Sequence, residues 1–451
     1  MSERPLPPVA KRCCSPSKRE QIGKPMNRQS TALSAGAIPP GALGVMWKTV
    51  SEDCNLACDY CYYSRSGGRP DPRRRQIDPA LLETVIREYM SLAHGAVGFA
   101  WQGGEPLLAG VEFFEQVVAL QAKHAPPGTT IGNALQTNGT LITDEWARFF
   151  RKYNFLVGVS IDGPREIHDA HRTTATGKGS FDLVMRRIEH LRDHDVDFNI
   201  LTVLHQGNVD KPRELWTFYQ REGFRYVQFI PAMDFCAQSP DLPPRYLISA
   251  DQYGRFLCAS FDLWYNDGAP TMSERFFDHA LSICAGRRAE TCKYAQMCSP
   301  TLVIEQNGDT YPCDFYLSAD HRLGNVGSDS LHEIFGSPAY RRFKRLKEQL
   351  PEKCRRCSHL NLCHGGCPRD RTWDGSGHAT EPDYFCNAYR QFFDYAHERL
   401  TLLARRLRMQ WLIDYTRSGQ EWPGRNETCI CGSGGKFKRC CGPLLTELQN
   451  D

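Results

Sequence analysis

Three cysteines early in the chain have a spacing suited to metal chemistry. Cys54, Cys58 and Cys61 form a CxxxCxxC loop in a sequence of 451 residues with twenty cysteines. Closely spaced thiolates on one loop can bind three irons of a [4Fe–4S] cluster and leave the fourth iron open to a chelating small molecule. Structural zinc sites instead prefer four ligands, usually from paired CxxC units. The spacing therefore favours an open-sited iron–sulfur cluster over zinc.

A second group of eight cysteines lies further along the chain. Its members are Cys292, Cys298, Cys313, Cys354, Cys357, Cys363, Cys367 and Cys386. Eight thiolates are enough for two more [4Fe–4S] clusters. They are also enough for two structural zinc sites, and Cys354 with Cys357 resembles half of a zinc ribbon. Spacing alone leaves both alternatives open.

A third group, Cys429, Cys431, Cys440 and Cys441, lies near the C-terminus in a CxC…CC arrangement. Four thiolates at this spacing suit tetrahedral zinc. A disulfide pair is the weaker alternative, because the reducing cytosol disfavours disulfides. We therefore expect zinc here, with Cys441 inferred as the fourth ligand.

The elements that must position the first cysteine loop alternate between short strands and amphipathic helices. Strands are predicted at 45–50, 97–101, 130–136, 156–161, 197–203 and 226–230. Helices are predicted at 79–93, 111–124, 143–153, 180–194, 209–222 and 251–266. Such alternation indicates βα units around a parallel sheet. Six units fit an α/β fold of the partial (β/α)6 TIM-like barrel type, and a doubly wound sheet is the alternative.

Polar segments follow two of the predicted strands directly. Gln102-Gly103-Gly104-Glu105 follows the second strand, and Ser160-Ile161-Asp162-Gly163 follows the fourth. Parallel α/β folds place their chemistry at the carboxyl ends of strands. Both segments are therefore expected beside the loop of the first three cysteines.

Changes in composition and in residue pattern along the chain predict its domain organisation. Residues 1–43 are rich in Pro, Ser, Arg and Lys and are predicted to be a disordered leader. Residues 44–270 would form the barrel, and residues 271–416 a cysteine-rich domain closed by a helix at 387–416. Residues 423–443 are predicted to be a separate zinc-binding tail.

The overall composition excludes some classes of partner. The net charge is +3, and no apolar run is long enough to span a bilayer. We expect neither nucleic acid nor a membrane as partner. The basic N-terminus lacks a following apolar segment, so a secretory signal is not predicted, and a cytoplasmic location is expected.

The CxxxCxxC loop and the two polar segments together resemble the radical S-adenosylmethionine (SAM) superfamily, whose motifs occur here in the same order. The resemblance implies that the open iron binds SAM. It also implies that SAM is contacted by Tyr60, Gly103, Gly104, Glu105, Ser160, Asp162, Arg172 and Met233.

The eight later cysteines resemble a SPASM domain, which carries auxiliary clusters in radical SAM enzymes that modify peptides. The resemblance implies three [4Fe–4S] clusters in all, with interleaved ligation of the two auxiliary ones. One cluster would bind Cys292, Cys298, Cys313 and Cys367. The other would bind Cys354, Cys357, Cys363 and Cys386.

The match narrows to the anaerobic sulfatase-maturating enzymes through Tyr311-Pro312-Cys313-Asp314-Phe315 and Leu362-Cys363-His364-Gly365-Gly366-Cys367-Pro368-Arg369. The resemblance implies oxidation of a Cys or Ser side chain of a sulfatase to Cα-formylglycine. Asp314 would be the catalytic base, and Tyr63 and Gln102 would position the substrate. The implied partners are a sulfatase precursor or peptide and an electron donor such as flavodoxin or ferredoxin.

The C-terminal segment from Arg425 to Gly442 resembles the SEC-C motif, a small zinc knuckle, and we expect it to recruit a protein. Two other functions are considered. One is a SPASM enzyme that forms thioether or carbon–carbon crosslinks in a ribosomal peptide. The other is a non-enzymatic zinc-binding adaptor, which leaves the two polar segments unexplained.

Overall fold

The computed structural model describes residues 43–63, 77–92, 95–232, 246–287, 289 and 291–450. All of them belong to one compact unit of the chain, residues 38–451. The predicted leader, apart from Leu43, and Met233 lie outside the described residues.

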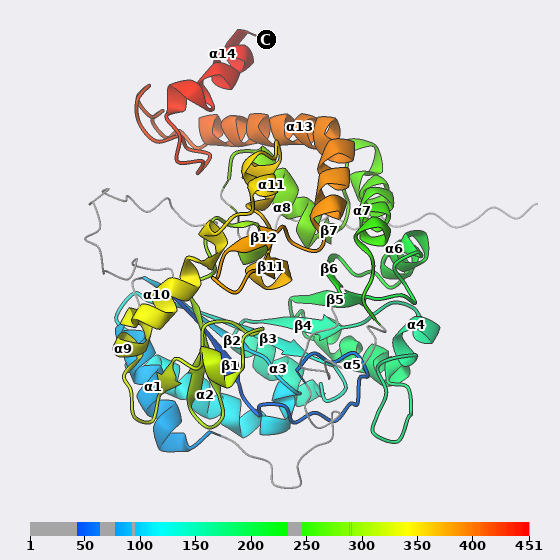
Figure 1. The fold of residues 1–451 in the computed structure, drawn as a ribbon, viewed down its shortest axis with the longest axis vertical. Helices are drawn as coiled ribbons and strands as arrows, with labels where there is room; N and C mark the ends of the chain where they lie inside the picture. Colours follow the sequence, from blue (N-terminus) through cyan, green and yellow to red (C-terminus); the bar gives the residue numbers. More distant parts are fainter. Residues whose placement is uncertain are drawn as a thin grey trace, which may run out of the picture. The chain divides into compact units, whose positions relative to one another are not determined.

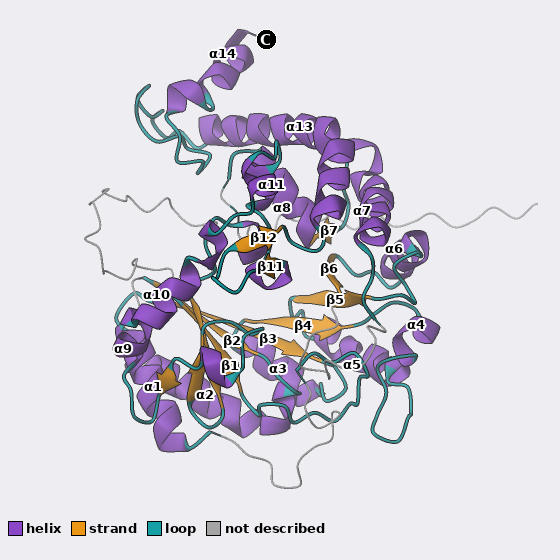
Figure 2. Ribbon diagram, in the orientation of Figure 1, coloured by secondary structure: helices purple, strands orange, loops and turns teal. Residues whose placement is uncertain are grey.

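The described residues contain a ten-stranded sheet in the order β10-β9-β8-β1-β2-β3-β4-β5-β6-β7 (Figures 1 and 2). The bounds are β1 Gly44–Lys48, β2 Ala96–Trp101, β3 Thr130–Thr137, β4 Phe155–Ser160, β5 Phe198–Leu204, β6 Tyr226–Pro231, β7 Ser273–Glu274, β8 Thr301–Glu305, β9 Asp309–Tyr311 and β10 Gly324–Asn325. Strands β1 to β7 are parallel, and each pairs with the next in the chain. A doubly wound sheet would reverse its strand order at a switch point. The unbroken order therefore excludes that alternative and confirms the partial barrel.

The helices between these strands begin and end close to the predicted residues, except α4, a short helix that was not predicted. Their bounds are α1 Pro79–Ser91, α2 Val111–His124, α3 Asp144–Lys152, α4 Arg165–Asp169, α5 Phe181–Asp193, α6 Pro212–Arg221 and α7 Ala250–Tyr265. Capping explains several starts: Asp78 accepts hydrogen bonds from the first turn of α1, and Thr143 accepts one from Trp146 in α3. Right-handed crossovers between strands of monotonic order place the helices on one face of the sheet.

The core between sheet and helices is aromatic. Trp47 stacks on Trp101 with ring centroids 5.5 Å apart, and Trp101 meets Phe114 of α2 edge-on at 5.3 Å. All three side chains are buried. Burial of such rings is a large part of the hydrophobic stabilisation of a domain. It fixes the carboxyl ends of β1 and β2, directly before the segments that carry the polar groups.

The cysteine-rich segment 284–386 has no sustained strand or helix pattern in its sequence, which predicts irregular structure. This prediction was wrong in one important respect. Thr301–Glu305 forms β8, which pairs in parallel with β1, and β9 and β10 follow as antiparallel strands. The connection between β8 and β9 contains Asn307 and Gly308, and Gly308 has φ +85°. An Asn-Gly pair between β-branched residues is a strong hairpin signal. The strands are only five and three residues long, so the surrounding cysteines obscured them.

The remaining elements are short except for one long helix. They are α8 Arg275–Cys284, α9 Leu331–Gly336, α10 Pro338–Lys344, α11 Glu352–Arg355, α12 Leu360–Cys363, β11 Thr372–Trp373, β12 Ala379–Glu381, α13 Cys386–Arg417 and α14 Gly442–Asn450. Helix α13 packs on α7 and α8: Phe392 contacts Phe276 and Phe261, and Arg399 pairs with Asp262 at 2.7 Å. The first half of α13 is thereby fixed to the barrel.

Candidate active site

The first cysteine loop follows β1 at the carboxyl end of the sheet. The Cys61 N–H donates to the Cys58 carbonyl at 3.2 Å, and the Leu56 N–H points at the Cys54 sulfur at 3.4 Å. Asn138, which follows β3, donates to the Cys54 sulfur at 3.6 Å. The loop is therefore held both by its own turns and by the end of a neighbouring strand.

Burial makes these thiols poor acids in the absence of a cation. It raises the pKa of Cys54 to about 12, with the negative charge of Glu105 adding to the effect. Burial likewise raises the pKa of Cys58 to about 12, although Arg172 opposes the shift. A bound metal ion deprotonates a coordinating thiol outright. The chemistry of this donor set thus fits a positively charged iron centre.

The Gly103-Gly104-Glu105 segment crosses directly over this loop. The Glu105 N–H donates to the Asp53 carbonyl at 2.8 Å, and a Cβ on Gly104 (φ +50°) would overlap the Asp53 backbone. The Glu105 side chain is fully buried and accepts hydrogen bonds from Thr137 and Asn138, both at 2.7 Å. Burial raises the pKa of Glu105 to about 7. Glycine is therefore required for close backbone contact, and Glu105 ties the segment to β3.

The segment after β4 forms a buried ion pair. Arg172 donates to Asp162 through Nε at 2.9 Å and Nη2 at 3.2 Å, and the Tyr60 hydroxyl also contacts Asp162. Burial favours a raised pKa for Asp162, but the charge and hydrogen bonds of Arg172 outweigh it and lower the pKa. The nearby Ser160 hydroxyl accepts a hydrogen bond from Gln136 at 3.0 Å. The structure thus brings Tyr60, Asp162 and Arg172 together beside the cysteine loop.

A second buried constellation surrounds Asp314, which follows β9. Its carboxylate contacts the Nζ of Lys48 and the hydroxyl of Tyr62, and the Gln102 amide lies 3.5 Å from Oδ2. Asp314 is 9% exposed, and the side chain of Lys48 is fully buried. The structure therefore places two predicted residues, Asp314 and Gln102, beside each other.

Tyr63 contacts a different carboxylate. Its hydroxyl donates to Glu305, the last residue of β8, at 2.8 Å, and Ser51 donates to the same carboxylate. Burial raises the pKa of Glu305, while hydrogen bonds from Ser51 and Tyr63 and the charge of Lys48 oppose the shift. Tyr63 is the sequence neighbour of Tyr62, which contacts Asp314. The Tyr63 ring lies 4.4 Å from Lys48 Nζ.

The eight later cysteines separate into two neighbourhoods. Burial raises the pKa of Cys313 to about 12, and the charges that add to this effect include those of Cys367 and Cys292. Burial also raises the pKa of Cys298 to about 11, again with Cys367 and Cys292 among its charged neighbours. These four thiols, from separate segments of the chain, are close enough to influence one another electrostatically.

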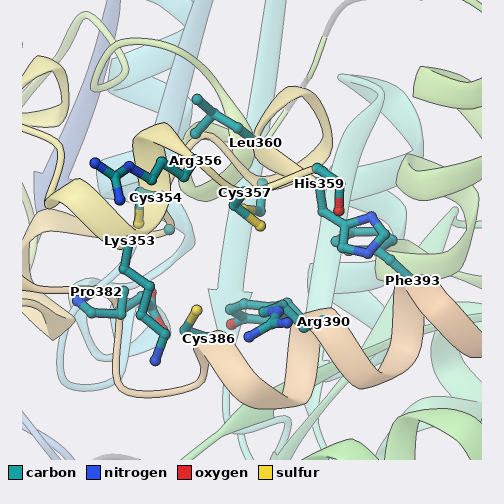
Figure 3. A pocket seen from close by; sticks show the side chains of 16 residues that line it. Lys353, Cys354, Arg356, Cys357, His359, Leu360, Pro382, Cys386, Arg390 and Phe393 are labelled. Atoms are coloured by element: carbon teal, nitrogen blue, oxygen red, sulfur yellow. The ribbon is translucent and has the colours of Figure 1, made fainter.

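The other four line a cavity of about 250 Å³. Its walls include Cys354, Cys357, Cys363 and Cys386. Figure 3 shows the sulfurs of Cys354, Cys357 and Cys386 directed into this space from α11, the following turn and the start of α13. Lys353, Arg356 and Arg390 stand around the same cavity and are exposed. Four thiols that line one cavity fit a cubane cluster.

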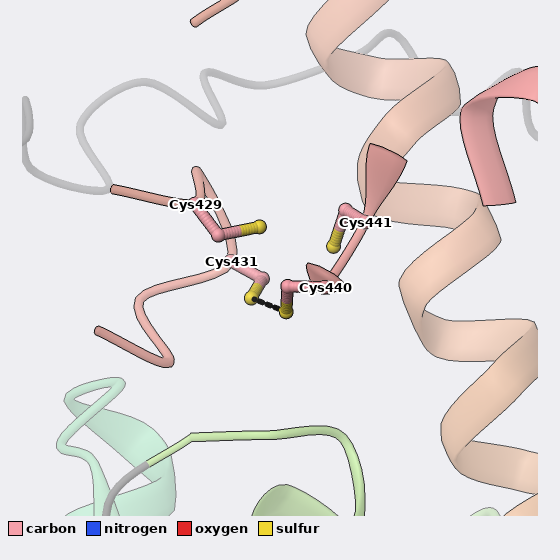
Figure 4. Close-up of side chains that lie close together, drawn as sticks. All are labelled: Cys429, Cys431, Cys440 and Cys441. Atoms are coloured by element: carbon pink, nitrogen blue, oxygen red, sulfur yellow. Dashed lines mark hydrogen bonds between the residues drawn. The ribbon is translucent and has the colours of Figure 1, made fainter. Parts of the chain in front are cut away.

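The C-terminal cysteines converge more tightly. The sulfurs of Cys429, Cys431, Cys440 and Cys441 all lie within 4.8 Å of one another (Figure 4). A tetrahedron with Zn–S bonds of about 2.3 Å has edges of about 3.8 Å. The Cys431 and Cys440 sulfurs are 3.4 Å apart. This donor set fits a single tetrahedral ion.

Sequence reasoning missed three side chains of the site: Lys48, Tyr62 and Glu305. Lys48 and Glu305 are the last residues of β1 and β8, and these two strands pair so that the residues are neighbours in register. A Lys and a Glu at strand ends usually lie in solvent. A pairing across more than two hundred residues was needed to show that Lys48 is buried and that Glu305, partly buried, lies beside it.

Family comparisons agree with this geometry. Residues 49–217 match the radical SAM superfamily, residues 292–358 the SPASM iron–sulfur cluster-binding domain, and residues 425–443 the SEC-C motif. The chain is therefore a radical SAM enzyme with a cluster-binding extension, and it uses SAM and [4Fe–4S] clusters.

Two similar curated relatives narrow the class of radical SAM enzyme. A cysteine-type anaerobic sulfatase-maturating enzyme of Clostridium perfringens is 36% identical over 82% of this chain and 100% of its own length. A serine-type anaerobic sulfatase-maturating enzyme of Bacteroides thetaiotaomicron is 37% identical over 82% of this chain and 92% of its own length. The chain belongs to the anaerobic sulfatase-maturating enzymes, so the family prediction is confirmed.

Solved structures give the same result. The structure of native anSMEcpe with bound AdoMet and Cp18Cys peptide covers 82% of this chain at 36% identity, with a TM-score of 0.75. SuiB of Streptococcus suis bound to S-adenosylmethionine is 15% identical with a TM-score of 0.55, and it shares the fold. No helix in the described part of the chain combines the length and apolar character needed to cross a membrane.

Proposed function

We propose that this enzyme oxidises a Cys or Ser side chain of a sulfatase peptide to Cα-formylglycine. The observation that carries the proposal is the position of Asp314. It is a buried carboxylate beside Gln102, next in sequence to Cys313, and it contacts Tyr62, which directly follows the CxxxCxxC loop. The cysteine-type and serine-type relatives support the substrate class.

The residues proposed to bind the first cluster and SAM lie at the carboxyl edge of the parallel sheet. Cys54, Cys58 and Cys61 would hold the first cluster, and SAM would lie between the Gly103-Gly104 backbone and the Asp162–Arg172 pair. When bound, this cluster and SAM supply a 5′-deoxyadenosyl radical that removes a hydrogen atom from the substrate Cβ. Arg172 donates two side-chain hydrogen bonds to Asp162, so a SAM carboxylate would share a guanidinium that is already oriented. Ser160, Tyr60 and Glu105 complete the proposed set, together with Met233 outside the described residues.

Asp314 would then accept the proton of the substrate S–H or O–H group. A general base must lie within hydrogen-bond reach of that proton, and Gln102 is placed to hold the same group through its amide. The side chain would lose a hydrogen atom to the 5′-deoxyadenosyl radical, a proton to Asp314 and one electron to the auxiliary cluster that Cys313 would help to hold. This leaves a thioaldehyde from Cys or an aldehyde from Ser. Water converts the thioaldehyde to the aldehyde and releases hydrogen sulfide. Tyr63 is proposed to help position the peptide.

The test is anaerobic incubation of the reconstituted full-length protein with SAM, a reductant and a sulfatase peptide. Both Cys-containing and Ser-containing versions are supplied, since both types of relative match. The proposal expects an aldehyde in the peptide, detected by mass spectrometry and by reaction with a hydrazide. A crosslinked peptide without aldehyde would support the ribosomal-peptide alternative instead.

A variant tests the role of Asp314 itself. Asp314→Asn should lower formylglycine formation by about 10²–10⁴-fold, the usual contribution of a general base. Cleavage of SAM without peptide oxidation should persist, and the iron content should be unchanged. Asp320→Asn is the matched control, because Asp320 is an exposed aspartate of the same connecting segment. Normal turnover by Asp314→Asn would remove Asp314 from the mechanism.

The ligands of two auxiliary clusters are proposed from the two neighbourhoods of thiols. Cys292, Cys298, Cys313 and Cys367 would hold one cluster, and Cys354, Cys357, Cys363 and Cys386 the other.

The exposed cations Lys353, Arg356 and Arg390 line the cavity of Cys354, Cys357, Cys363 and Cys386. They favour an acidic electron carrier of the flavodoxin or ferredoxin type. Their replacement by Gln should slow reduction by flavodoxin and leave reduction by dithionite unchanged. Equal rates with flavodoxin would exclude this docking face.

The C-terminal segment is proposed to bind zinc through Cys429, Cys431, Cys440 and Cys441. Arg408 of α13 supports this site: its Nη2 donates to the Cys440 carbonyl at 2.6 Å and lies 3.7 Å from the Cys441 sulfur. Metal analysis of purified protein should give one zinc per chain, lost in Cys431→Ser. Iron at these cysteines would contradict the proposal.

We also propose domain limits of 44–270, 271–416 and 423–443. We further propose that the enzyme is cytoplasmic. Reduced thiol sites favour a reducing compartment. Recruitment of a sulfatase precursor by the tail is tested by deletion from Pro423 onward. If capture of the precursor in cells is unchanged, the tail has another role.

A further inference from the structure

The most unusual charge in the described barrel is Lys48, the last residue of β1. Its side chain is fully buried, in the middle of the sheet edge that carries the proposed active site. Lysines are almost never fully buried unless they are paired, because removing an ammonium group from water costs several kcal/mol. A buried lysine at this position therefore requires a partner that compensates its charge.

That partner is Asp314. Lys48 Nζ contacts Asp314 Oδ1, while the Tyr62 hydroxyl contacts Oδ2. Within the described residues, Nζ makes no hydrogen bond to a backbone carbonyl or a side-chain amide. The charge of Lys48 is thus compensated by Asp314 and by the Tyr63 ring, 4.4 Å from Nζ, with Glu305 as a second carboxylate in register on β8.

The two carboxylate oxygens of Asp314 therefore have different partners. Oδ1 contacts the Nζ of Lys48, and the Lys48 side chain is fully buried. Oδ2 is directed toward Tyr62 and Gln102, on the side where the substrate group is proposed to bind. An ion pair restricts both the position and the rotation of a carboxylate, because the charge holds one oxygen in place.

We propose that Lys48 is a positioning residue that holds Asp314 with one carboxylate oxygen facing the peptide side chain. The inference rests on the proposed function of Asp314 as the base. Lys48 itself does not touch the reacting atoms. It acts through Asp314, and the loss of its charge leaves the base free to turn away.

The aliphatic part of Lys48 has a separate, structural contact. A Cβ on Gly103 would lie against the Cδ of Lys48, and Gly103 has φ +108°. The lysine stem therefore lies under the segment proposed to bind SAM. A useful variant must keep this stem and remove only the charge. Lys48→Met satisfies both conditions, because methionine is unbranched and fills similar space.

The experiment measures formylglycine formed per 5′-deoxyadenosine released, with iron content and the rate of SAM cleavage recorded on the same samples. In Lys48→Met we expect this ratio to fall by about tenfold or more, a part of the contribution of a general base. Iron content and SAM cleavage should remain at the wild-type level. Lys48→Arg, which keeps a cation, should recover at least part of the ratio. Loss of iron or of SAM cleavage in Lys48→Met would assign Lys48 a structural role and overturn the proposal.

A double variant separates this proposal from the one on which it rests. If Lys48 acts through Asp314, then Lys48→Met should lower the ratio no further in an Asp314→Asn background. An equal fall in both backgrounds would show that the two residues act independently, which contradicts the proposal. A low ratio in Asp314→Asn with a normal ratio in Lys48→Met would refute the role of Lys48 alone. A normal ratio in Asp314→Asn would refute the role of Asp314.

Discussion

The thiols of the barrel site and those of the C-terminal knuckle, defined as residues 425–443, are brought together by different means. Cys54, Cys58 and Cys61 lie on a loop after β1, and the groups around them come from strands far away in the sequence. The four knuckle thiols come from one short segment and lie within 4.8 Å of one another. The barrel site depends on the whole sheet, whereas the knuckle depends on local turns and on one helix.

This contrast has a chemical counterpart. The barrel site surrounds its thiols with buried ion pairs, Asp162–Arg172 and Asp314–Lys48. The knuckle has a small apolar cluster, including Leu412 and Phe437, and Arg408 donates a hydrogen bond to its Cys440 carbonyl. A reactive centre requires oriented charges, while a structural ion requires only ligands and a scaffold. We therefore expect the two regions to respond differently to substitution.

The largest difference is expected when one ligand is removed from each region. Cys58→Ser should abolish SAM cleavage, because the first cluster loses one of its three protein ligands. Cys431→Ser should remove zinc and leave SAM cleavage and peptide oxidation unchanged. Both are measured by 5′-deoxyadenosine release and metal content. Loss of peptide oxidation in Cys431→Ser would show that the regions are functionally coupled.

The next largest effect is expected for the buried ion pair beside the first cluster. Arg172→Met leaves Asp162 as an unpaired buried charge, and such a loss typically costs about 3–5 kcal/mol of stability. Denaturant unfolding under anaerobic conditions measures this cost, and equilibrium dialysis measures SAM binding. The exposed pair Arg165–Asp182 offers a control, since Arg165→Met should change stability little. Equal effects of the two variants would contradict the assigned burial.

A smaller effect is expected at the knuckle. Arg408→Gln removes the cation beside Cys440 and Cys441, and outer-shell partners typically contribute about 10–100-fold to metal affinity. Competition with a zinc chelator should show a loss in this range. Arg405→Gln is the matched control on the same helix, since Arg405 pairs with the exposed Glu447 and not with a thiol. The same zinc affinity in wild type and Arg408→Gln would separate α13 from the metal site.

The smallest effect concerns pH. Burial lowers the pKa of His279 from 6.5 to about 4. The unfolded chain therefore binds more protons between these values, so stability is fully present above about pH 6.5 and declines as the pH falls toward 4. His279→Gln should flatten this decline in the unfolding free energy of the protein. A decline as steep as in wild type would show that other groups cause it.

Much of the fold could be predicted because strands β2 to β6 and their helices have strong, regular patterns. The site was predictable where a motif is local, as for Cys54 and its neighbours or for Gly104, whose backbone must approach Asp53 closely. Lys48 and Glu305 were missed, because nothing in the local sequence of either strand signals burial. Their role emerges only from the parallel pairing of β1 with β8.

The central claim is that radical chemistry at this sheet edge acts on the Cβ of a sulfatase peptide. The most direct measurement uses a peptide deuterated at Cβ of the target Cys or Ser, with the reconstituted wild-type protein and SAM. The account predicts that deuterium appears in 5′-deoxyadenosine in step with aldehyde in the peptide. Unlabelled 5′-deoxyadenosine, or labelled 5′-deoxyadenosine with a crosslinked peptide that lacks an aldehyde, would contradict it.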